Sequence, residues 1–321
     1  MTPSTAGRSG KSGRGPRPER RRTSPPACAG ARPASAGIRR VGVVGAGLMG
    51  SGIAEVCARA GLDVLVRETG PDAVRAGRDR ITASLDRGLR SGRLTEPERD
   101  AALGRIRFTT DLADFADRDA AIEAVAEDEQ VKTEVFATLD KVLTRQDAIL
   151  ATNTSSIPVM KLAVATGRPE QVVGIHFFNP VPVMPLVELV PSLLTGHQAR
   201  CVAEDFATAR LGKHVIESQD RAGFVVNSLL VPYLLSAIRM LESGFATAED
   251  IDDGMVLGCA HPMGPLRLSD LIGLDTLKAI ADSLYQESKE PLHSPPALLL
   301  RMVDAGLLGK KSGRGFHGYA R

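Results

Sequence analysis

From residue 38 the chain alternates short apolar runs with longer amphipathic segments. Residues 41–44 form a short apolar run, and Gly45, Gly47 and Gly50 follow it in GxGxxG spacing. The glycines lead into an apolar helical pattern that continues through Ala60. Residues 64–67 form a second short run, and Glu68 follows it directly. A short apolar run bounded by turn residues is typical of a buried strand. The pattern therefore predicts a strand, turn, helix and strand in succession.

The alternation continues along the chain. Further strands are predicted over 105–109, 120–125 and 148–152, with helices over 71–90, 96–103 and 129–142. Strands that alternate with helices indicate an α/β fold with a mostly parallel, doubly wound sheet of the Rossmann type. Beyond residue 220 the pattern is helical, over 224–241, 248–258, 266–271, 275–287 and 296–305, with Thr247 as a predicted helix cap. This predicts an all-helical C-terminal domain after the sheet.

Three regions follow from these patterns. Residues 1–37 are rich in Gly, Pro, Ser and Arg, and such a basic segment buries too little apolar surface to fold, so we expect disorder there. Residues 38–220 are expected to form the nucleotide-binding domain of Rossmann type. Residues 221–321 are expected to form the helical domain, whose apolar first helix favours burial against a second subunit. The sequence thus predicts a homodimer formed through its C-terminal helices.

Composition excludes several classes of function. Lys and Arg number 40 against 38 Asp and Glu, so no global charge indicates a nucleic-acid partner or a membrane surface. The longest apolar stretch, 224–241, is interrupted by polar residues and is too short to span a bilayer. The 4 cysteines show neither CxxC nor metal-site spacing. We therefore expect no metal, and a reducing, cytoplasmic location.

The glycine turn carries a specific chemistry. Gly45 permits a tight turn, Gly47 lets the backbone approach a pyrophosphate, and Gly50 lets the helix pack on the strand. The helix N-terminus offers free N–H groups to phosphates. Glu68 lies about 20 residues downstream, where an acid holds a ribose and repels a 2′-phosphate, which favours NAD over NADP, although the neighbouring Arg67 weakens that preference. The alternative is a glycine-rich turn in an unrelated α/β protein.

Two strand ends carry polar groups, and ligands bind at the carboxyl ends of strands in such sheets. Glu127 follows the strand at 120–125, with Lys132 on the next helix. Small hydroxyl and amide side chains follow the strand at 148–152. Ser156 is the predicted cap of a helix that begins at Ile157-Pro158, which leaves Ser155 to face the cleft.

The stretch 173–190 places His176 near Asn179 and puts one carboxylate, Glu188, a short strand later. A His and a Glu in an apolar, proline-stiffened segment suggest a general base and the carboxylate that orients it. The alternative is a core histidine bonded to a neighbouring strand, and the stretch alone does not decide between them. Four other histidines, 197, 214, 293 and 317, are predicted to lie at the surface, and His261 in a Pro/Gly loop.

Several motifs occur in a fixed order and together carry a family resemblance. They are GAGLMGSGIAEV, NTSSIP, HFFNPVPVMPLVELV, GKHVIESQDRAGFVVNSLLVPYLLSAI, HPMGPLRLSDLIGLDTL and GKKSGRGF. The chain resembles the 3-hydroxyacyl-CoA dehydrogenase family from about residue 38 to 321, and within it the stand-alone bacterial members. The resemblance implies an NAD-dependent oxidoreductase that interconverts (S)-3-hydroxybutanoyl-CoA and acetoacetyl-CoA in fatty-acid or butanoate metabolism, and a homodimer.

The resemblance also implies roles for individual residues. His176 is the expected catalytic base with Glu188 as its partner, while Ser155 and Asn227 contact the reacting oxygen of the substrate. The dinucleotide contacts are expected from Gly45, Gly47, Leu48, Met49, Gly50, Glu68, Glu127, Lys132, Ser155, Asn179 and Lys311. A serine on the long helix after the second strand contacts CoA in some relatives, and Ser84 fits that position.

The chain departs from the family pattern at three places. The family usually reads DxPGFxxNR where this chain has Ala222 for the proline and Ser228 for the arginine. The acid after the second strand is usually Asp rather than Glu68. No Lys follows Ser84 as in those relatives, and the CoA contacts stay open among Arg87, Arg90 and Arg93.

Two other functions stay under consideration. A dehydrogenase of the β-hydroxyacid or 6-phosphogluconate class shares the glycine loop but is expected to use a Lys as its key group. A dinucleotide-binding protein with a structural role would not require Ser155, His176, Glu188 and Asn227 together. A coenzyme A thioester oxidation assay separates all three.

Overall fold

The computed structural model describes residues 37–319, which all belong to one compact unit, Arg32–Arg321. The predicted basic extension, apart from Gly37, lies outside the described residues. Within the described range, no helix is both long and apolar enough to cross a membrane.

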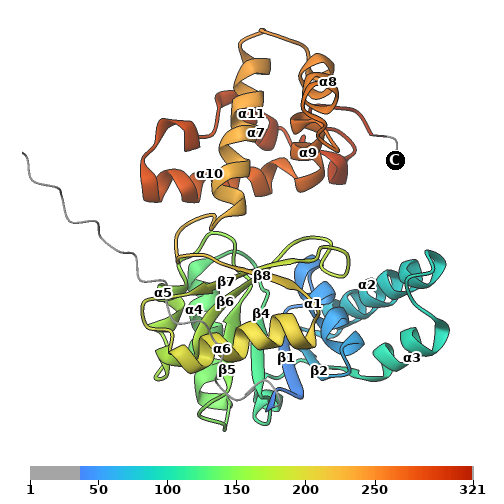
Figure 1. Ribbon diagram of the computed structural model, residues 1–321, viewed down its shortest axis with the longest axis vertical. Coiled ribbons are helices and arrows are strands. Elements are labelled where there is room, and N and C mark those ends of the chain that lie inside the picture. The colour runs from blue at the N-terminus through green and yellow to red at the C-terminus, as the bar shows by residue number, and fades with distance from the viewer. Residues whose placement is uncertain (1–36, 320–321) are drawn as a thin grey trace, which may run out of the picture. The chain divides into compact units, whose positions relative to one another are not determined.

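The centre of the fold is a sheet with the strand order β3-β2-β1-β4-β5-β6-β7-β8 (Figure 1). Strands β1 to β6 pair in parallel, β7 runs antiparallel to β6, and β8 pairs in parallel with β7. The predicted mostly parallel sheet is confirmed. The strands are β1 (Arg40–Val44), β2 (Asp63–Arg67), β3 (Ile106–Thr109), β4 (Ala120–Glu123), β5 (Ile149–Thr152), β6 (Val172–Phe177), β7 (Leu186–Pro191) and β8 (His214–Glu217).

Helices cover both faces of the sheet, which explains why its central strands are apolar throughout. One core cluster joins the sheet to α1 (Leu48–Arg59), α2 (Pro71–Arg90), α3 (Glu96–Gly104) and α6 (His197–Asp205). The other joins it to α4 (Glu129–Val142) and α5 (Val159–Ala163). Figure 1 shows α1 and α6 in front of the strands. The predicted limits of α2 and α4 agree with the structure, whereas α6, the π-helix Phe206–Arg210 and β8 were not predicted.

The C-terminal part is helical, as predicted, and has a core cluster of its own. Thr247 caps α8, because its hydroxyl oxygen accepts the N–H of Asp250 at 3.1 Å. The helices are α7 (Val226–Glu242), α8 (Ala248–Cys259), α9 (Pro265–Ile272), α10 (Leu274–Ser288) and α11 (Ala297–Asp304).

The prediction that His317 lies at the surface is wrong. His317 is buried, and its Nε2 lies 2.7 Å from a carboxylate oxygen of Asp252. Its backbone N–H donates to Asp270 at 2.9 Å, and the Tyr319 hydroxyl donates to the same carboxylate at 3.0 Å. The end of the chain therefore folds back onto α8 and α9. Asp252 precedes His317 by 65 residues, so no local spacing indicated this partner.

Candidate active site

A pocket of about 700 Å³ opens at the carboxyl ends of β1, β4, β5 and β6. It lies at the point where the strand order reverses between β1 and β4, which is where open α/β sheets bind ligands. Side chains from α7 and α10 also line it. Among the lining residues are these that the sequence singled out: Gly45, Gly47, Leu48, Met49, Glu68, Glu127, Lys132, Ser155, His176, Asn179 and Asn227.

The glycine loop has the geometry that a dinucleotide requires. Gly45 has a φ of +97°, and a Cβ added there would lie 2.7 Å from the carbonyl oxygen of Ala124. A Cβ on Gly50 would lie 1.9 Å from the oxygen of Gly45, so the helix packs directly on the turn. At Gly47, which lines the pocket, an added Cβ would meet no atom of the described chain within 4 Å. The open space beside Gly47 therefore fits a phosphate group.

Glu68 and the start of α1 fit the ribose and the phosphates of a dinucleotide. One carboxylate oxygen of Glu68 accepts the N–H of Ala46 at 2.5 Å, which ties the acid to the glycine loop. The other accepts the N–H of Thr69 at 3.1 Å. The first turn of α1 carries no acidic residue, and no described side chain caps it, so its N–H groups can bind an anion.

His176 and Glu188 face each other across the antiparallel pair of β6 and β7. The Nδ1 of His176 lies 2.7 Å from Oε2 of Glu188, and Glu188 is fully buried. An ionised Glu188 places the proton on Nδ1 and leaves the Nε2 lone pair for a substrate. His176 is 6% exposed and lines the pocket, and the centroid of its ring lies 4.7 Å from that of Phe178. This is the arrangement of a positioned general base.

Glu188 also holds the start of α7. Its Oε1 accepts the backbone N–H groups of Val225 and Val226 at 3.0 and 2.9 Å. Asn227, the next residue, lines the pocket. One buried carboxylate therefore fixes both His176 and the helical turn that carries Asn227. The sequence predicted the contact with His176 but not the contact with α7.

A buried ion-pair network around Lys132 is centred on Glu123, which was not predicted as a site residue. Lys132 Nζ lies 2.6 Å from Glu123 and 3.2 Å from Glu127. Glu123 is fully buried and also accepts the N–H of Val125 at 2.7 Å and the hydroxyl of Thr152 at 2.8 Å. A carboxylate within the apolar run 120–125 was the signal that could have identified it.

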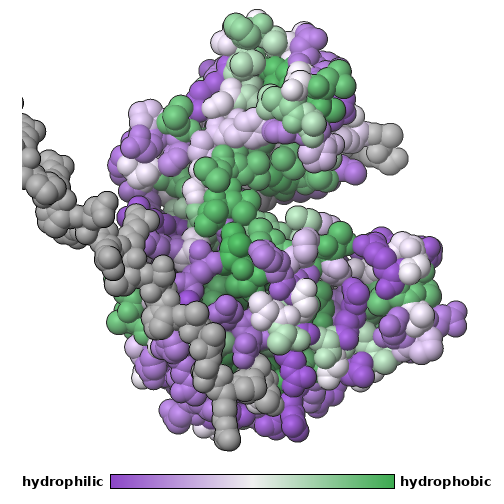
Figure 2. All heavy atoms as spheres, viewed as in Figure 1, coloured by the Kyte–Doolittle hydropathy of each residue, from purple (hydrophilic) through white to green (hydrophobic). Residues whose placement is uncertain are grey.

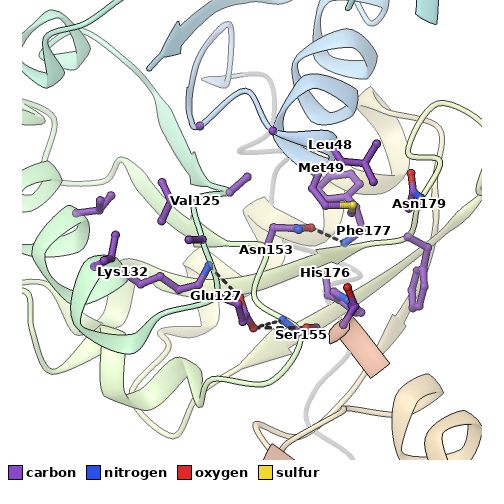
Figure 3. A pocket seen from close by; sticks show the side chains of 18 of the residues that line it. Leu48, Met49, Val125, Glu127, Lys132, Asn153, Ser155, His176, Phe177 and Asn179 are labelled. Atoms are coloured by element: carbon purple, nitrogen blue, oxygen red, sulfur yellow. Dashed lines mark hydrogen bonds and ion pairs between the residues drawn. The ribbon is translucent and has the colours of Figure 1, made fainter. Parts of the chain in front are cut away.

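Glu127 in turn organises the hydroxyl loop after β5. Its Oε1 accepts the hydroxyl of Thr154 at 2.5 Å, the N–H of Ser155 at 3.0 Å and the hydroxyl of Ser156 at 2.9 Å. Figure 3 shows Glu127 between Lys132 and Ser155, with Ser155 and His176 at the same end of the pocket. The charge of Lys132 is thereby linked to the placement of Ser155.

The prediction that Ser156 caps a helix is wrong. Helix α5 begins at Val159, and its first N–H groups, on Val159 and Met160, donate to the two carboxylate oxygens of Asp220 at 2.7 Å each. A residue about 60 positions later supplies the cap, so Ser156 is free to bond Glu127 instead. Ser155 lines the pocket as expected.

We expect the contribution of Glu127 to stability to depend on pH. Burial raises the pKa of this carboxyl, but the charge of Lys132 and hydrogen bonds from Thr154 and Ser156 outweigh burial, so the pKa lies below its ordinary value of 4.5. A carboxyl with a lowered folded-state pKa stabilises the fold above its unfolded pKa and loses this contribution as the pH falls through the folded pKa. Glu127→Gln should therefore lower the thermal midpoint at neutral pH, and the difference from wild type should shrink below about pH 4.5.

Thermal unfolding of both proteins across this pH range measures the effect. Glu129→Gln is the matched control, because Glu129 pairs with Lys161 at 2.6 Å and both side chains are about half exposed. A difference between wild type and Glu127→Gln that stays constant from neutral to acidic pH would contradict the lowered pKa of Glu127.

Apart from Glu188, which bonds His176, three predicted site residues are not among the described residues that line this pocket. Gly50 packs against the backbone of Gly45. Lys311 Nζ lies 2.6 Å from the carboxylate of Asp275. Ser84 lies on α2 against Glu55. Their ligand contacts stay predictions. Two further residues that line the pocket were not predicted, Asn153 and Thr276 on α10. The side-chain oxygen of Asn153 accepts the N–H of Phe177 at 2.9 Å and joins the ends of β5 and β6.

Known proteins are similar to this chain over most of its length. The model of the 3-hydroxyacyl-CoA dehydrogenase NAD-binding domain matches residues 40–221, and that of the C-terminal domain matches residues 223–319. A 3-hydroxybutyryl-CoA dehydrogenase of Mycobacterium tuberculosis is 64% identical over 282 residues, which cover 88% of this chain and 99% of the relative.

Solved structures give the same result. The crystal structure of M. tuberculosis FadB2 superposes with a TM-score of 0.87 at 64% identity, over 88% of this chain and 99% of that one. The (S)-3-hydroxybutyryl-CoA dehydrogenase of Ralstonia eutropha superposes with a TM-score of 0.83 at 43% identity, over 88% and 100% of the two chains. These matches confirm the family resemblance that the motifs indicated.

Proposed function

This chain belongs to the 3-hydroxyacyl-CoA dehydrogenase family, and we propose that it interconverts (S)-3-hydroxybutanoyl-CoA and acetoacetyl-CoA with NAD. The observation that carries the proposal is the His176–Glu188 pair, at 2.7 Å, in the same pocket as the glycine loop. A β-hydroxyacid dehydrogenase would be expected to use a Lys in place of this pair. The relatives at 64% and 43% identity are named for 3-hydroxybutyryl-CoA, which supports the short acyl chain.

We propose a role for each polar residue near His176. In the oxidative direction, Nε2 of His176 takes the proton of the C3 hydroxyl, and Glu188 stabilises the imidazolium that forms. Ser155 and Asn227 donate hydrogen bonds to the oxygen as it changes from hydroxyl to ketone. Bound NAD supplies the hydride acceptor. In reduction, protonated His176 returns the proton to the oxygen.

Stereochemistry tests this function. We expect oxidation of (S)-3-hydroxybutanoyl-CoA with NAD, and at least about a hundredfold slower oxidation of the R isomer. Only the S isomer directs its hydroxyl toward His176 and its C3 hydrogen toward the cofactor at the same time. Absorbance of the NADH formed measures both rates. Equal rates for the two isomers, or no oxidation of either, would contradict the assignment.

The preference for NAD over NADP is proposed to depend on Glu68. The hydrogen bond from the Ala46 N–H fixes its carboxylate beside the glycine loop, so a negative charge lies where the ribose of the cofactor would bind. Glu68→Ala should reduce the ratio of kcat/KM for NADH over NADPH by about tenfold or more, since it removes the repulsion of a 2′-phosphate. Arg67 also lines the pocket and can bond that phosphate once the acid is gone. An unchanged ratio would show that selectivity arises elsewhere.

The homodimer is proposed to form through the C-terminal helices, whose surface shows apolar residues in Figure 2. Leu229 on α7 is 73% exposed and Leu257 on α8 is 83% exposed. We expect a mass of twice 34.0 kDa by light scattering. Leu229→Glu should shift the protein toward monomer, because a charge at an apolar interface is costly. Leu193→Glu, at a side chain that is 94% exposed beyond β7, is the matched control. A monomeric wild type would contradict the proposal.

Three further predictions stay proposals. The boundary between an NAD-binding domain at 38–220 and a dimerisation domain at 221–321 is one of them. The cytoplasmic location rests on the spacing of the cysteines, and the place in fatty-acid or butanoate metabolism rests on the substrate.

A further inference from the structure

Phe224 lies in the turn that joins β8 to α7, and its backbone conformation is rare for a residue of its type. Its φ is +47°, in the left-handed region. A positive φ is uncommon for residues other than glycine, because the Cβ atom then lies too close to the following carbonyl oxygen. Such a conformation persists only where the surrounding structure fixes it, and it often occurs at functional positions. The contacts that hold Phe224 therefore indicate what its ring does.

Hydrogen bonds hold the turn on both sides of Phe224. Its N–H donates to the carbonyl oxygen of Arg221 at 3.1 Å, and its carbonyl oxygen accepts the hydroxyl of Ser228. The N–H groups of the next two residues donate to Oε1 of Glu188 at 3.0 and 2.9 Å. Ser228 stands where the family pattern usually has an arginine. Its bond to Phe224 gives this departure a structural role.

Neighbouring side chains of the turn enter different cores. Ala222 belongs to the core cluster of the C-terminal helices. Phe224 is buried in the cluster that joins the sheet to α4 and α5, and among the described members of that cluster it alone comes from beyond residue 190. The ring is therefore fixed against the sheet, although its backbone leads directly into α7.

The ring of Phe224 packs on the imidazole of His176. The two ring centroids lie 5.4 Å apart, and the ring planes meet at 61°, which is an edge contact. Phe178 contacts the same imidazole and lines the active-site pocket. Phe224 is not among the described residues that line this pocket. It therefore contacts His176 from the protein interior rather than from the side of the substrate.

Glu188 by itself does not fix the orientation of the imidazole. Its hydrogen bond holds one ring atom, Nδ1, at 2.7 Å. The torsion that turns a histidine ring has broad minima, so the ring can still tilt about that contact. A second contact, from a ring whose own backbone is fixed, restricts the tilt. The direction of Nε2 then depends on Phe224 as well as on Glu188.

We propose that Phe224 is a positioning residue for His176, which keeps Nε2 directed at the oxygen of the substrate. This inference rests on the proposed function, because the proton transfer at His176 is what Phe224 would assist. Both contacts share one anchor, since Oε2 of Glu188 binds the imidazole while Oε1 holds the turn that carries Phe224. A misplacement of about 1 Å in a reacting group can cost about a hundredfold in rate.

Phe224→Leu tests the proposal, because it keeps an apolar side chain but removes the flat ring. Its kcat for acetoacetyl-CoA reduction should fall by about tenfold or more, with KM for NADH unchanged. Phe115→Leu is the matched control, since Phe115 is fully buried in the same core cluster and is absent from the described lining of the pocket. It should lower the thermal midpoint and keep kcat. Equal kcat values for the two variants would overturn the proposal.

The double variant His176→Ala/Phe224→Leu distinguishes positioning from a general disturbance. If Phe224 acts through the imidazole, the double variant should have the kcat of His176→Ala to within about twofold, because residues that act as a unit are not additive. A further loss of about tenfold in the double variant would show that Phe224 acts on another part of the site, and it would contradict the proposal.

Ser228→Ala loosens the turn without opening the core, so it decides the matter if Phe224→Leu does not fold. It should lower kcat by about two- to tenfold, since one hydrogen bond that holds Phe224 is lost. Ser236→Ala is the matched control, because it removes a bond of the same kind from the same helix, to the carbonyl oxygen of Pro232 at 2.7 Å. The same kcat in both serine variants would count against the role of the turn.

Proton NMR measures the position of the imidazole without turnover. The Nδ1 proton of His176, which is bound to Glu188 over 2.7 Å, should resonate far downfield and be missing in His176→Ala. The resonance should shift or broaden in Phe224→Leu but not in Phe115→Leu. An identical resonance in wild type and both variants would overturn the proposal. If wild type failed to reduce acetoacetyl-CoA while the resonance still depended on Phe224, the proposed function would fail but the positioning of His176 would stand.

Discussion

His176→Ala is expected to lower kcat for acetoacetyl-CoA reduction by about 10²–10⁴-fold, because a positioned acid–base group contributes on that order. The imidazole lies at the pocket wall with its Nδ1 on a buried carboxylate, so the proton that moves in the reaction is placed on the other nitrogen. Alanine leaves Glu188 without that partner. The N–H groups of Val225 and Val226 still bind its second oxygen, so we expect the fold and NADH binding to survive.

Fluorescence titration with NADH and steady-state rates on the same samples separate the two effects. His261→Ala is the matched control, since His261 bonds the Tyr233 hydroxyl at 3.2 Å and is not among the described residues that line the pocket. If His176→Ala kept kcat within a few-fold of wild type while binding NADH, His176 would be a core histidine and not the base.

Glu188→Gln should produce the second largest loss, about a hundredfold in kcat. The amide has nearly the shape of the carboxylate, but its oxygen can accept from His176 or from the start of α7, and not from both. The amide also lacks the charge that stabilises the imidazolium. The thermal midpoint should fall as well, since a buried donor left without a partner costs about 1–3 kcal/mol.

Glu287→Gln provides the matched control. Glu287 accepts the N–H of Ala222 at 2.7 Å, close to the start of α7, and it is absent from the described lining of the pocket. That variant should keep kcat close to wild type, because its amide oxygen can still accept the N–H of Ala222. If Glu188→Gln behaved in the same way, Glu188 would hold α7 without assisting His176.

Features set by local sequence were predicted well. The limits of α2 and α4 agree with the structure because a proline at the first turn of α2 and the apolar period of both helices act over a few residues. The glycine loop is equally local, since Gly45 and Gly50 leave no room for a Cβ. The partnership of His176 and Glu188 could be inferred because both lie in one segment of 18 residues, and the register of β6 and β7 then places them opposite each other.

Features set by distant parts of the chain were missed. Asp220 caps α5 from about 60 residues away, so Ser156 was the best local candidate and the wrong one. His317 meets Asp252 only because the end of the chain folds back. Glu123 lies within the predicted strand 120–125 and was not selected, yet its buried carboxylate binds Lys132. In each case a polar group is satisfied by a partner that local spacing does not indicate.

Acetoacetyl-CoA reduction by the wild-type protein, followed by loss of NADH absorbance, tests the central claim most directly. We predict steady turnover with NADH and formation of the S product. A protein that binds NADH in the glycine-loop pocket but does not reduce acetoacetyl-CoA would contradict the proposed function.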